Sequence, residues 1–300
     1  MTSIVTSMHR EPGDEVSFGL PFGQPQATRV IAVSSGKGGV GKTNVVVNLA
    51  VALSRRGEDV MVLDGDLGLS NVNVLLGVKA DYNLSHVLSG ERSLDDIVIE
   101  APDCIRVVPS ASGVTHMARL GDAELAAIVH AFADLRTPPS VLLVDSEAGL
   151  SPATLQLNAA AHEVIVVLCD EPAAITDAYA YIKCMHQEHG KIRFHVLANM
   201  VDGNAHGLEL FKKLARVSDR FLEVSLNYLG AVPNDQTLRD AVRCQRAVCA
   251  AYPRSRSASA FYEIANHVVR WPLPTLPSGR LEFFVERMLA GENVSLEVTA

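Results

Sequence analysis

The stretch Gly36-Lys37-Gly38-Gly39-Val40-Gly41-Lys42-Thr43 decides how the rest of the chain is organised. It follows the apolar run Val30-Ile31-Ala32-Val33 and precedes the apolar segment 45–53, so the local order is strand, glycine-rich loop, helix. The spacing G-x-x-x-x-G-K-[ST] is typical of a phosphate-binding loop, because glycines permit positive φ and leave no Cβ between backbone N–H groups and the ligand. The sequence therefore predicts a polyphosphate site at the start of a helix, where anions are favoured.

Individual side chains of this loop have separate expected roles. Lys42 is expected to reach the β- and γ-phosphates, and the Thr43 hydroxyl is expected to bind Mg²⁺. Asn44, the next residue, is included among the nucleotide-binding residues together with the loop itself. A glycine-rich surface turn without a ligand is the alternative, which the flanking strand and helix disfavour.

Composition restricts the class of protein. The chain has 300 residues, 48% of them hydrophobic, which is enough for one large core, and the strand and helix alternation favours one domain over two. A formal net charge of −8 disfavours a broad nucleic-acid-binding surface but is compatible with local basic patches. Five cysteines without C-x-x-C spacing predict neither a disulfide framework nor a zinc site, which fits a reduced cytoplasm. The sequence predicts neither export nor a membrane span.

Carboxylates follow two further predicted strands. The run 58–63 ends in Asp64-Gly65-Asp66, and the apolar run 140–144 ends in Asp145. Ligands of open α/β sheets bind at the carboxyl ends of the strands, so Asp66 is expected to face the γ-phosphate, its metal or the attacking water. Asp145 is expected to hold Mg²⁺ through water as a Walker B aspartate, with an exposed strand-end aspartate as the alternative. Asp64 is expected to be structural.

The remaining segments continue the alternation of strands and helices. Strands are predicted over 30–33, 58–63, 105–109, 140–144, 163–168, 193–198 and 228–232, and helical segments over 45–53, 82–100, 124–135, 173–188, 211–221, 236–246 and 258–270. This order predicts an α/β fold with a doubly wound, mostly parallel sheet of about seven strands and helices on both faces.

The loop resembles the deviant Walker A motif of the MinD/ParA family of ATPases, and Asp145-Ser146-Glu147-Ala148-Gly149 resembles the D-[ST]-x-A-G switch of that family. The resemblance extends from about Arg29 to Leu289 and implies a MinD-like P-loop fold, slow hydrolysis of ATP with Mg²⁺, and an ATP-bound homodimer. It also implies catalytic roles for two residues. Lys37 would cross the dimer interface to the nucleotide of the other subunit, and Asp66 would position metal and water. A solvated loop lysine is the alternative for Lys37.

Glu147 departs from the family pattern, because Ala, Pro or Gly is expected at this position. We expect its side chain to point outward to a partner rather than at the γ-phosphate, since a carboxylate beside three phosphate charges is repelled.

The exits of the last two predicted strands are expected to hold the base. A GTPase base-reading motif would need a lysine after Asn199, and Met200 stands there instead, so adenine is favoured. The family resemblance implies a nucleotide contact by Asn199 and a base pocket beside Pro233 and Asp235.

Strings at 169–180, 196–200, 245–248 and 281–289 resemble the flagellar-number regulators within this family. This resemblance implies two partners, a flagellar transcriptional activator and the flagellar SRP-type GTPase, although the N-terminal D-Q-A motif by which some members bind the GTPase is absent. A ParA-like partitioning ATPase acting on DNA or cellular cargo is the alternative, and the negative charge makes direct DNA binding less expected. An iron–sulfur carrier would need a cysteine soon after Asp145, and 146–168 contains none.

The ends of the chain differ in composition from the ATPase domain predicted over 29–270. Residues 1–28 are expected to form a disordered arm, 271–279 a proline-rich linker, and 280–300 an amphipathic helix and tail. One helix face at i, i+3, i+4, i+7 and i+8 is predicted to consist of Leu281, Phe284, Val285, Met288 and Leu289. The resemblance implies reversible contact of this face with the inner membrane, and packing on the ATPase domain or on a protein partner are the alternatives.

Overall fold

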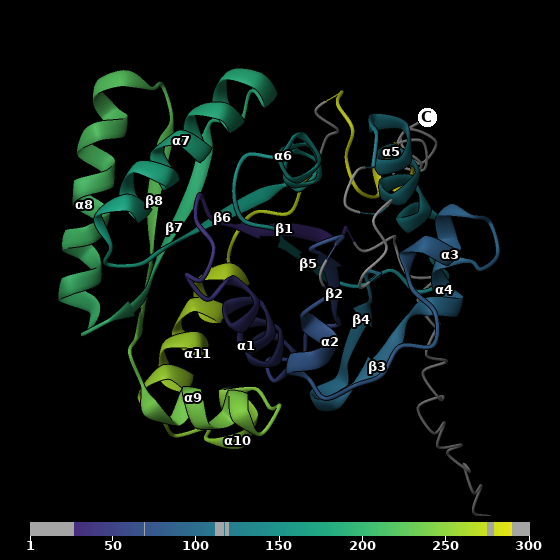
Figure 1. Ribbon diagram of the computed structural model, residues 1–300, viewed down its shortest axis with the longest axis horizontal. Coiled ribbons are helices and arrows are strands. Elements are labelled where there is room, and N and C mark those ends of the chain that lie inside the picture. Colours follow the sequence, from purple (N-terminus) through teal and green to yellow (C-terminus); the bar gives the residue numbers. More distant parts are fainter. Residues whose placement is uncertain (1–26, 69, 112–116, 118–119, 275–278, 290–300) are drawn as a thin grey trace, which may run out of the picture.

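An eight-stranded sheet forms the centre of the computed structural model, which describes residues 27–68, 70–111, 117, 120–274 and 279–289 (Figure 1). The strand order is β3-β4-β2-β5-β1-β6-β7-β8, and all neighbours pair in parallel except β3 with β4. The strands are β1 (Arg29–Ser34), β2 (Val60–Gly65), β3 (Ile99–Ala101), β4 (Ile105–Val108), β5 (Val141–Ser146), β6 (Glu163–Leu168), β7 (Arg193–Val201) and β8 (Ser225–Pro233).

Helices cover both faces of this sheet (Figure 1). They are α1 (Lys42–Ser54), α2 (Val72–Leu75), α3 (Leu84–Leu88), α4 (Leu94–Ile97), α5 (Asp122–Ala131), α6 (Pro152–Ala159), α7 (Pro172–His189), α8 (Asn204–Phe221), α9 (Gln236–Arg243), α10 (Val248–Ala251) and α11 (Arg256–Val268), with 3-10 turns at η1 (Pro102–Cys104) and η3 (Phe132–Asp134). Among the helices of the described residues, none combines the length and apolar character needed to cross a bilayer.

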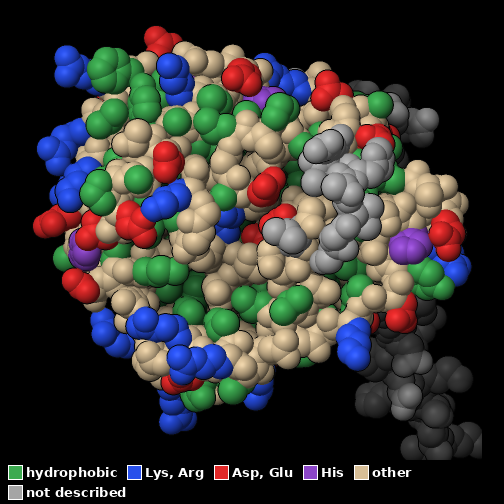
Figure 2. Space-filling model, in the orientation of Figure 1, with side chains coloured by type: hydrophobic (Ala, Val, Ile, Leu, Met, Phe, Trp, Pro, Cys, Tyr) green, Lys and Arg blue, Asp and Glu red, His purple; other side chains and the backbone are tan. Residues whose placement is uncertain are grey.

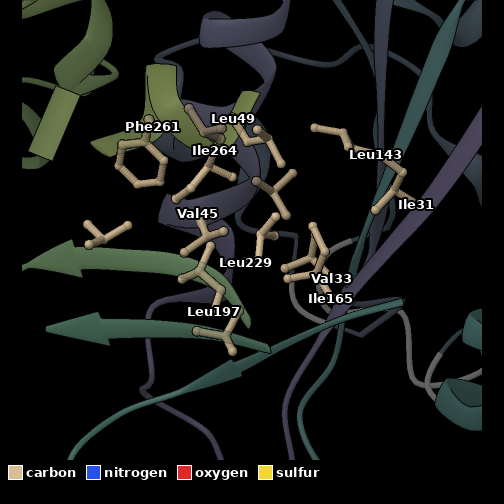
Figure 3. Packing of buried hydrophobic residues seen from close by; sticks show 14 of the residues in the cluster. Ile31, Val33, Val45, Leu49, Leu143, Ile165, Leu197, Leu229, Phe261 and Ile264 are labelled. Atoms are coloured by element: carbon tan, nitrogen blue, oxygen red, sulfur yellow. The ribbon is translucent and has the colours of Figure 1, made fainter. Parts of the chain in front are cut away.

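The central strands are apolar along their whole length because both of their faces are covered. In β1, Ile31 and Val33 join one buried cluster, whereas Val30 and Ala32 join a second cluster on the opposite face. Figure 3 shows side chains of the first cluster converging from the strands, α1 and α11. Strands with this burial are held in a single register, which fixes the ends of the strands where the predicted site residues lie.

The predicted fold is confirmed, with one strand more than expected. The segment 82–100, expected to be helical, instead contains α3, α4 and the short edge strand β3. Gly90, at φ 72°, follows the end of α3, and the side chain of Ser93 caps the start of α4. Two short capped helices therefore replace a single longer one, because each has its own start signal.

The C-terminal segment differs from the continuous amphipathic helix expected from Arg280. Phe284 has a φ of 61°, which a helix does not accommodate, and the described helical residues begin only at Val285. Phe283, outside the predicted face, is fully buried with Phe284, and both rings pack edge-on against Phe132. The predicted single apolar face is therefore wrong, although Leu289 at its end is about half exposed.

The other two flanking predictions fall partly outside the described residues. The arm predicted over 1–28 lies outside them up to residue 26, but Thr28 is buried and its hydroxyl donates to the Pro139 carbonyl at 2.7 Å. In the linker, residues 275–278 lie outside the description, whereas Trp271 stacks on His195 with ring centroids 3.8 Å apart.

His162 links the start of β1 to β6 through a hydrogen bond that depends on pH. The Val30 N–H donates to His162 Nδ1 at 3.1 Å, so this nitrogen must be unprotonated, and burial lowers the pKa of the imidazole from 6.5 to about 4. Since the unfolded chain binds this proton more readily, His162 contributes stability above pH 6.5 that is lost as the pH falls toward 4. The expected loss is roughly 3 kcal/mol at most.

The comparison with His162→Asn checks this expectation, because the amide oxygen accepts the same hydrogen bond and does not titrate. Chemical denaturation between pH 4 and pH 7 should show a steeper acid loss in the parent than in the variant. Equal slopes in the two proteins would assign the acid loss to other groups.

Candidate functional site

The glycine-rich loop has the backbone that its sequence predicts. Gly39 and Gly41 adopt φ of 79° and 89°, which residues with a side chain rarely adopt. At Gly36, a Cβ atom would lie 2.1 Å from the Asp177 carbonyl group on α7, so only glycine fits there. Helix α1 starts at Lys42 with no side-chain cap, which leaves the first N–H groups of the helix available to a ligand.

Lys42 lies under this loop and faces acidic groups. Its Nζ donates to Ser35 Oγ at 3.1 Å, and Ser35 Oγ in turn donates to the Lys37 carbonyl at 2.6 Å. Burial lowers the pKa of Lys42, while the negative charges of Asp145, Asp66 and Glu147 act in the opposite direction. The structure thus brings both predicted aspartates into the electrostatic field of the predicted phosphate-binding lysine.

Asp145 is a buried carboxylate with an unused oxygen. It lies at the end of β5 in register with Asp64 of β2. Burial and the neighbouring charge of Asp64 raise the pKa of Asp145 to about 7, although a hydrogen bond from Thr43 acts to lower it. Its Oδ1 atom has no hydrogen-bond partner among the described residues. A buried orphan oxygen beside a threonine hydroxyl is costly without a ligand, and these hard oxygen donors suit Mg²⁺.

Asp64 and Asp66 have different surroundings although they are two residues apart. Asp64 is fully buried and accepts hydrogen bonds from Ser70 Oγ at 2.7 Å and from the Asn71 N–H at 2.9 Å, which holds the start of α2. Asp66 is partly exposed, and its carbonyl accepts from Ser110 Oγ at 2.8 Å. The structural role expected for Asp64 is confirmed, whereas Asp66 accepts from Asn71 Nδ2 at 3.3 Å and its charge acts on Lys42.

Lys37 forms an ion pair with Glu171, which follows β6. Both side chains are substantially exposed, at 38% and 54%, so this pair contributes little to stability and is easily exchanged for another anion. Glu171 was not among the site residues predicted from the sequence. The available signal was its position at the carboxyl end of a central strand, the same edge as Asp66 and Asp145.

The residues after Asp145 connect the sheet to the loop. Ser146 Oγ donates to the Val33 carbonyl at 2.9 Å, and the Gly149 N–H donates to the Ser35 carbonyl at 3.1 Å. Glu147, between them, is exposed. Ser35 contacts the loop, Lys42 and this switch segment. It was not predicted, because a serine before the first glycine is not part of a distinctive sequence pattern.

The expected base end lies where β7 and β8 stop side by side. Asn199 Nδ2 donates to the Val40 carbonyl at 2.8 Å, so this amide links β7 to the phosphate loop. Met200 is bulged out of β7 with φ 57° and is 48% exposed, and Pro233 pairs with Val201. Such strained, re-aimed residues are concentrated at functional sites.

Asp235 serves the fold at this edge. Its Oδ1 accepts from the Thr237 N–H and hydroxyl at 3.0 and 2.7 Å, and its Oδ2 accepts from the Ser257 N–H and hydroxyl at 3.1 and 2.9 Å. The carboxylate therefore joins α9 to α11, and its contact with the nucleotide stays a prediction.

Comparisons with known proteins agree with this geometry. Residues 31–246 match the family described as the CobQ/CobB/MinD/ParA nucleotide binding domain. The antiactivator FleN of Pseudomonas aeruginosa is 49% identical over 268 residues, which are 89% of this chain and 96% of FleN. The flagellum site-determining protein YlxH of Helicobacter pylori is 33% identical over 270 residues, which cover 87% of this chain and 90% of YlxH.

A solved structure shows the same fold. The septum site-determining protein MinD of Pyrococcus horikoshii, complexed with Mg-ADP, superposes with a TM-score of 0.67 at 26% identity. The match covers 81% of this chain and 96% of that MinD chain.

Proposed function

This chain belongs to the CobQ/CobB/MinD/ParA nucleotide-binding family, and we propose that it is an ATP-dependent dimerising switch that regulates flagellar number and biosynthesis. It is an ATPase, with ATP, ADP and Mg²⁺ as its ligands. The observation that carries the switch proposal is the arrangement of the two loop lysines. Lys42 is in the field of Asp145 and Asp66, whereas Lys37 is partly exposed and pairs with Glu171.

The residues of the site would have different roles in phosphoryl transfer. The phosphates would be bound by backbone N–H groups of the loop and by Lys42. Mg²⁺ would be held by Thr43, Asp145 and Asp66, and its positive charge would stabilise the negative charge that develops on the phosphate. Asp66 would orient the attacking water, because it is the more exposed of the two aspartates at the end of β2. Positioning and charge carry this reaction more than covalent chemistry does.

Flagellar regulation is supported by the similarity to an antiactivator and to a flagellum site-determining protein. The partners we propose are a flagellar transcriptional activator, the flagellar SRP-type GTPase, and a second copy of this chain in the ATP-bound state. MinD of Aquifex aeolicus forms a complex with MinC, but at 21% identity that likeness concerns the fold alone.

Dimerisation is expected to depend on Lys37. In Lys37→Ala, the ATP-bound dimer should weaken by about tenfold to a hundredfold, since a charge-assisted contact to the partner's phosphate is lost. Sedimentation velocity with a non-hydrolysable ATP analogue measures the dimer. Lys183→Ala, which removes an exposed lysine from α7, is the matched control. Parent-like dimerisation and hydrolysis in Lys37→Ala would contradict the cross-subunit role.

We also propose reversible contact of the C-terminal segment with the inner membrane. Because Phe283 and Phe284 are buried against Phe132, this contact requires the segment to leave the ATPase domain and to expose these two rings with Leu281, Val285 and Met288, beside Leu289, which is already about half exposed. ATP should therefore increase co-sedimentation with anionic liposomes relative to ADP, and deletion of the residues after Gly279 should abolish it. Equal co-sedimentation of the parent with ATP, the parent with ADP and the deletion variant would exclude the contact.

A further inference from the structure

Arginines gather on one surface of an otherwise acidic protein. Five of them, at 239, 243, 246, 254 and 256, lie within 18 residues that contain one acidic residue, Asp240, and no lysine. This segment carries +4, so the rest of the chain carries −8 − 4 = −12. All five side chains are exposed, and Figure 2 shows basic side chains gathered over α9 and α10 at the bottom of the view. We call these five residues the arginine surface.

Little of this positive charge is neutralised within the chain. Arg243 reaches Asp240 at 3.4 Å, and within the described residues this is the one ion pair that the arginine surface forms. Arg239 donates to the Asn234 amide oxygen at 2.8 Å and Arg256 to the Asp202 carbonyl at 3.1 Å, both neutral acceptors. The surface therefore presents several guanidinium groups to an external anion.

The composition of the surface distinguishes between two kinds of anion. Arginine and tyrosine are enriched where proteins meet proteins, whereas lysine is depleted there. Tyr252, between the arginines, is 41% exposed, and the guanidinium fork matches a carboxylate in two parallel hydrogen bonds. A nucleic-acid duplex would be repelled at long range by the rest of the chain, because the rest of the chain is acidic. We propose that the arginine surface is a docking site for an acidic segment of a protein partner.

The location of the surface connects it to the base end of the site. Arg239 holds Asn234, directly after Pro233, and Arg256 holds Asp202, two residues after Met200. These two arginines brace the exits of β8 and β7 and are left unchanged in the test. Arg243, Arg246 and Arg254 have no such contact among the described residues, so they can be replaced without disturbing the base end.

The test uses the full chain and a fluorescent peptide of alternating glutamate and glycine, followed by anisotropy at low and high salt. The variant Arg243→Glu/Arg246→Glu/Arg254→Glu should lose about tenfold or more in affinity for this peptide. Lys212→Glu/Lys213→Glu/Arg216→Glu, on the exposed face of α8, changes the net charge equally and should stay within about twofold of the parent. Unchanged Mg·ADP affinity and thermal unfolding midpoints establish that both variants are folded.

Three results would overturn the proposal. The peptide does not bind the parent, the α8 variant loses as much affinity as the arginine variant, or a DNA duplex of matched charge binds the parent more tightly than the peptide does. The last result would identify a nucleic-acid surface. Since Mg·ADP binding is measured separately, failure of this proposal is distinguishable from failure of the ATPase assignment.

Discussion

Replacing Lys42 with alanine is expected to abolish measurable binding of Mg·ATP and Mg·ADP. The ammonium group is the buried positive charge beneath the loop, and without it the negative charges of Asp145 and Asp66 would repel the phosphates without compensation. With each hydrogen bond to a charged group contributing about 1.5–3 kcal/mol, the affinity should fall by about a hundredfold or more. ATP hydrolysis should be lost with it.

Calorimetric titration with Mg·ADP measures this effect without hydrolysis or ATP-driven dimerisation. Lys37→Ala provides the informative control, because its lysine lies in the same loop but pairs with Glu171 rather than facing the carboxylates. It should bind Mg·ADP as the parent does. If Lys42→Ala also binds Mg·ADP within about twofold of the parent, the phosphate-binding role of Lys42 is wrong.

Asp66→Ala is expected to retain ATP and to lose hydrolysis by about a hundredfold or more, because a positioned carboxylate contributes 10²–10⁴ in rate. Its backbone is held independently of the side chain, by Ser110 Oγ on its carbonyl and by Asp64 Oδ1 on its N–H at 3.3 Å. The loop and the fold should therefore persist. The ATP-bound dimer should accumulate, since its release requires hydrolysis.

Single-turnover phosphate release and ATP binding, measured on the same sample, separate the two possible roles of Asp66. Asp64→Asn is the contrasting variant. It weakens the acceptor that holds Asn71 and Ser70, so it should lower the unfolding midpoint. Loss of ATP binding in Asp66→Ala, with hydrolysis per bound nucleotide unchanged, would reassign Asp66 to binding alone.

The sequence by itself determined the parts of this protein that depend on neighbouring residues. The phosphate loop is recognisable because its glycines, Lys42 and Thr43 are close together in the sequence. Their spacing therefore determines their relative positions around a phosphate. Strands such as β6, predicted and found at Glu163–Leu168, are recognisable because burial on both faces demands a continuous apolar run. Asp66 and Asp145 follow from the rule that parallel strands bring their carboxyl ends to one edge.

Only the tertiary structure decided the contacts between distant segments. Lys37 and Glu171 are 134 residues apart, and they meet because β1 and β6 are neighbours in the strand order. Phe283 is buried against Phe132, which periodicity within 280–289 did not indicate, because a left-handed residue at 284 redirects the chain. Spacing along a chain specifies which face of an element a side chain occupies. The partner of that face depends on the order in which the elements pack.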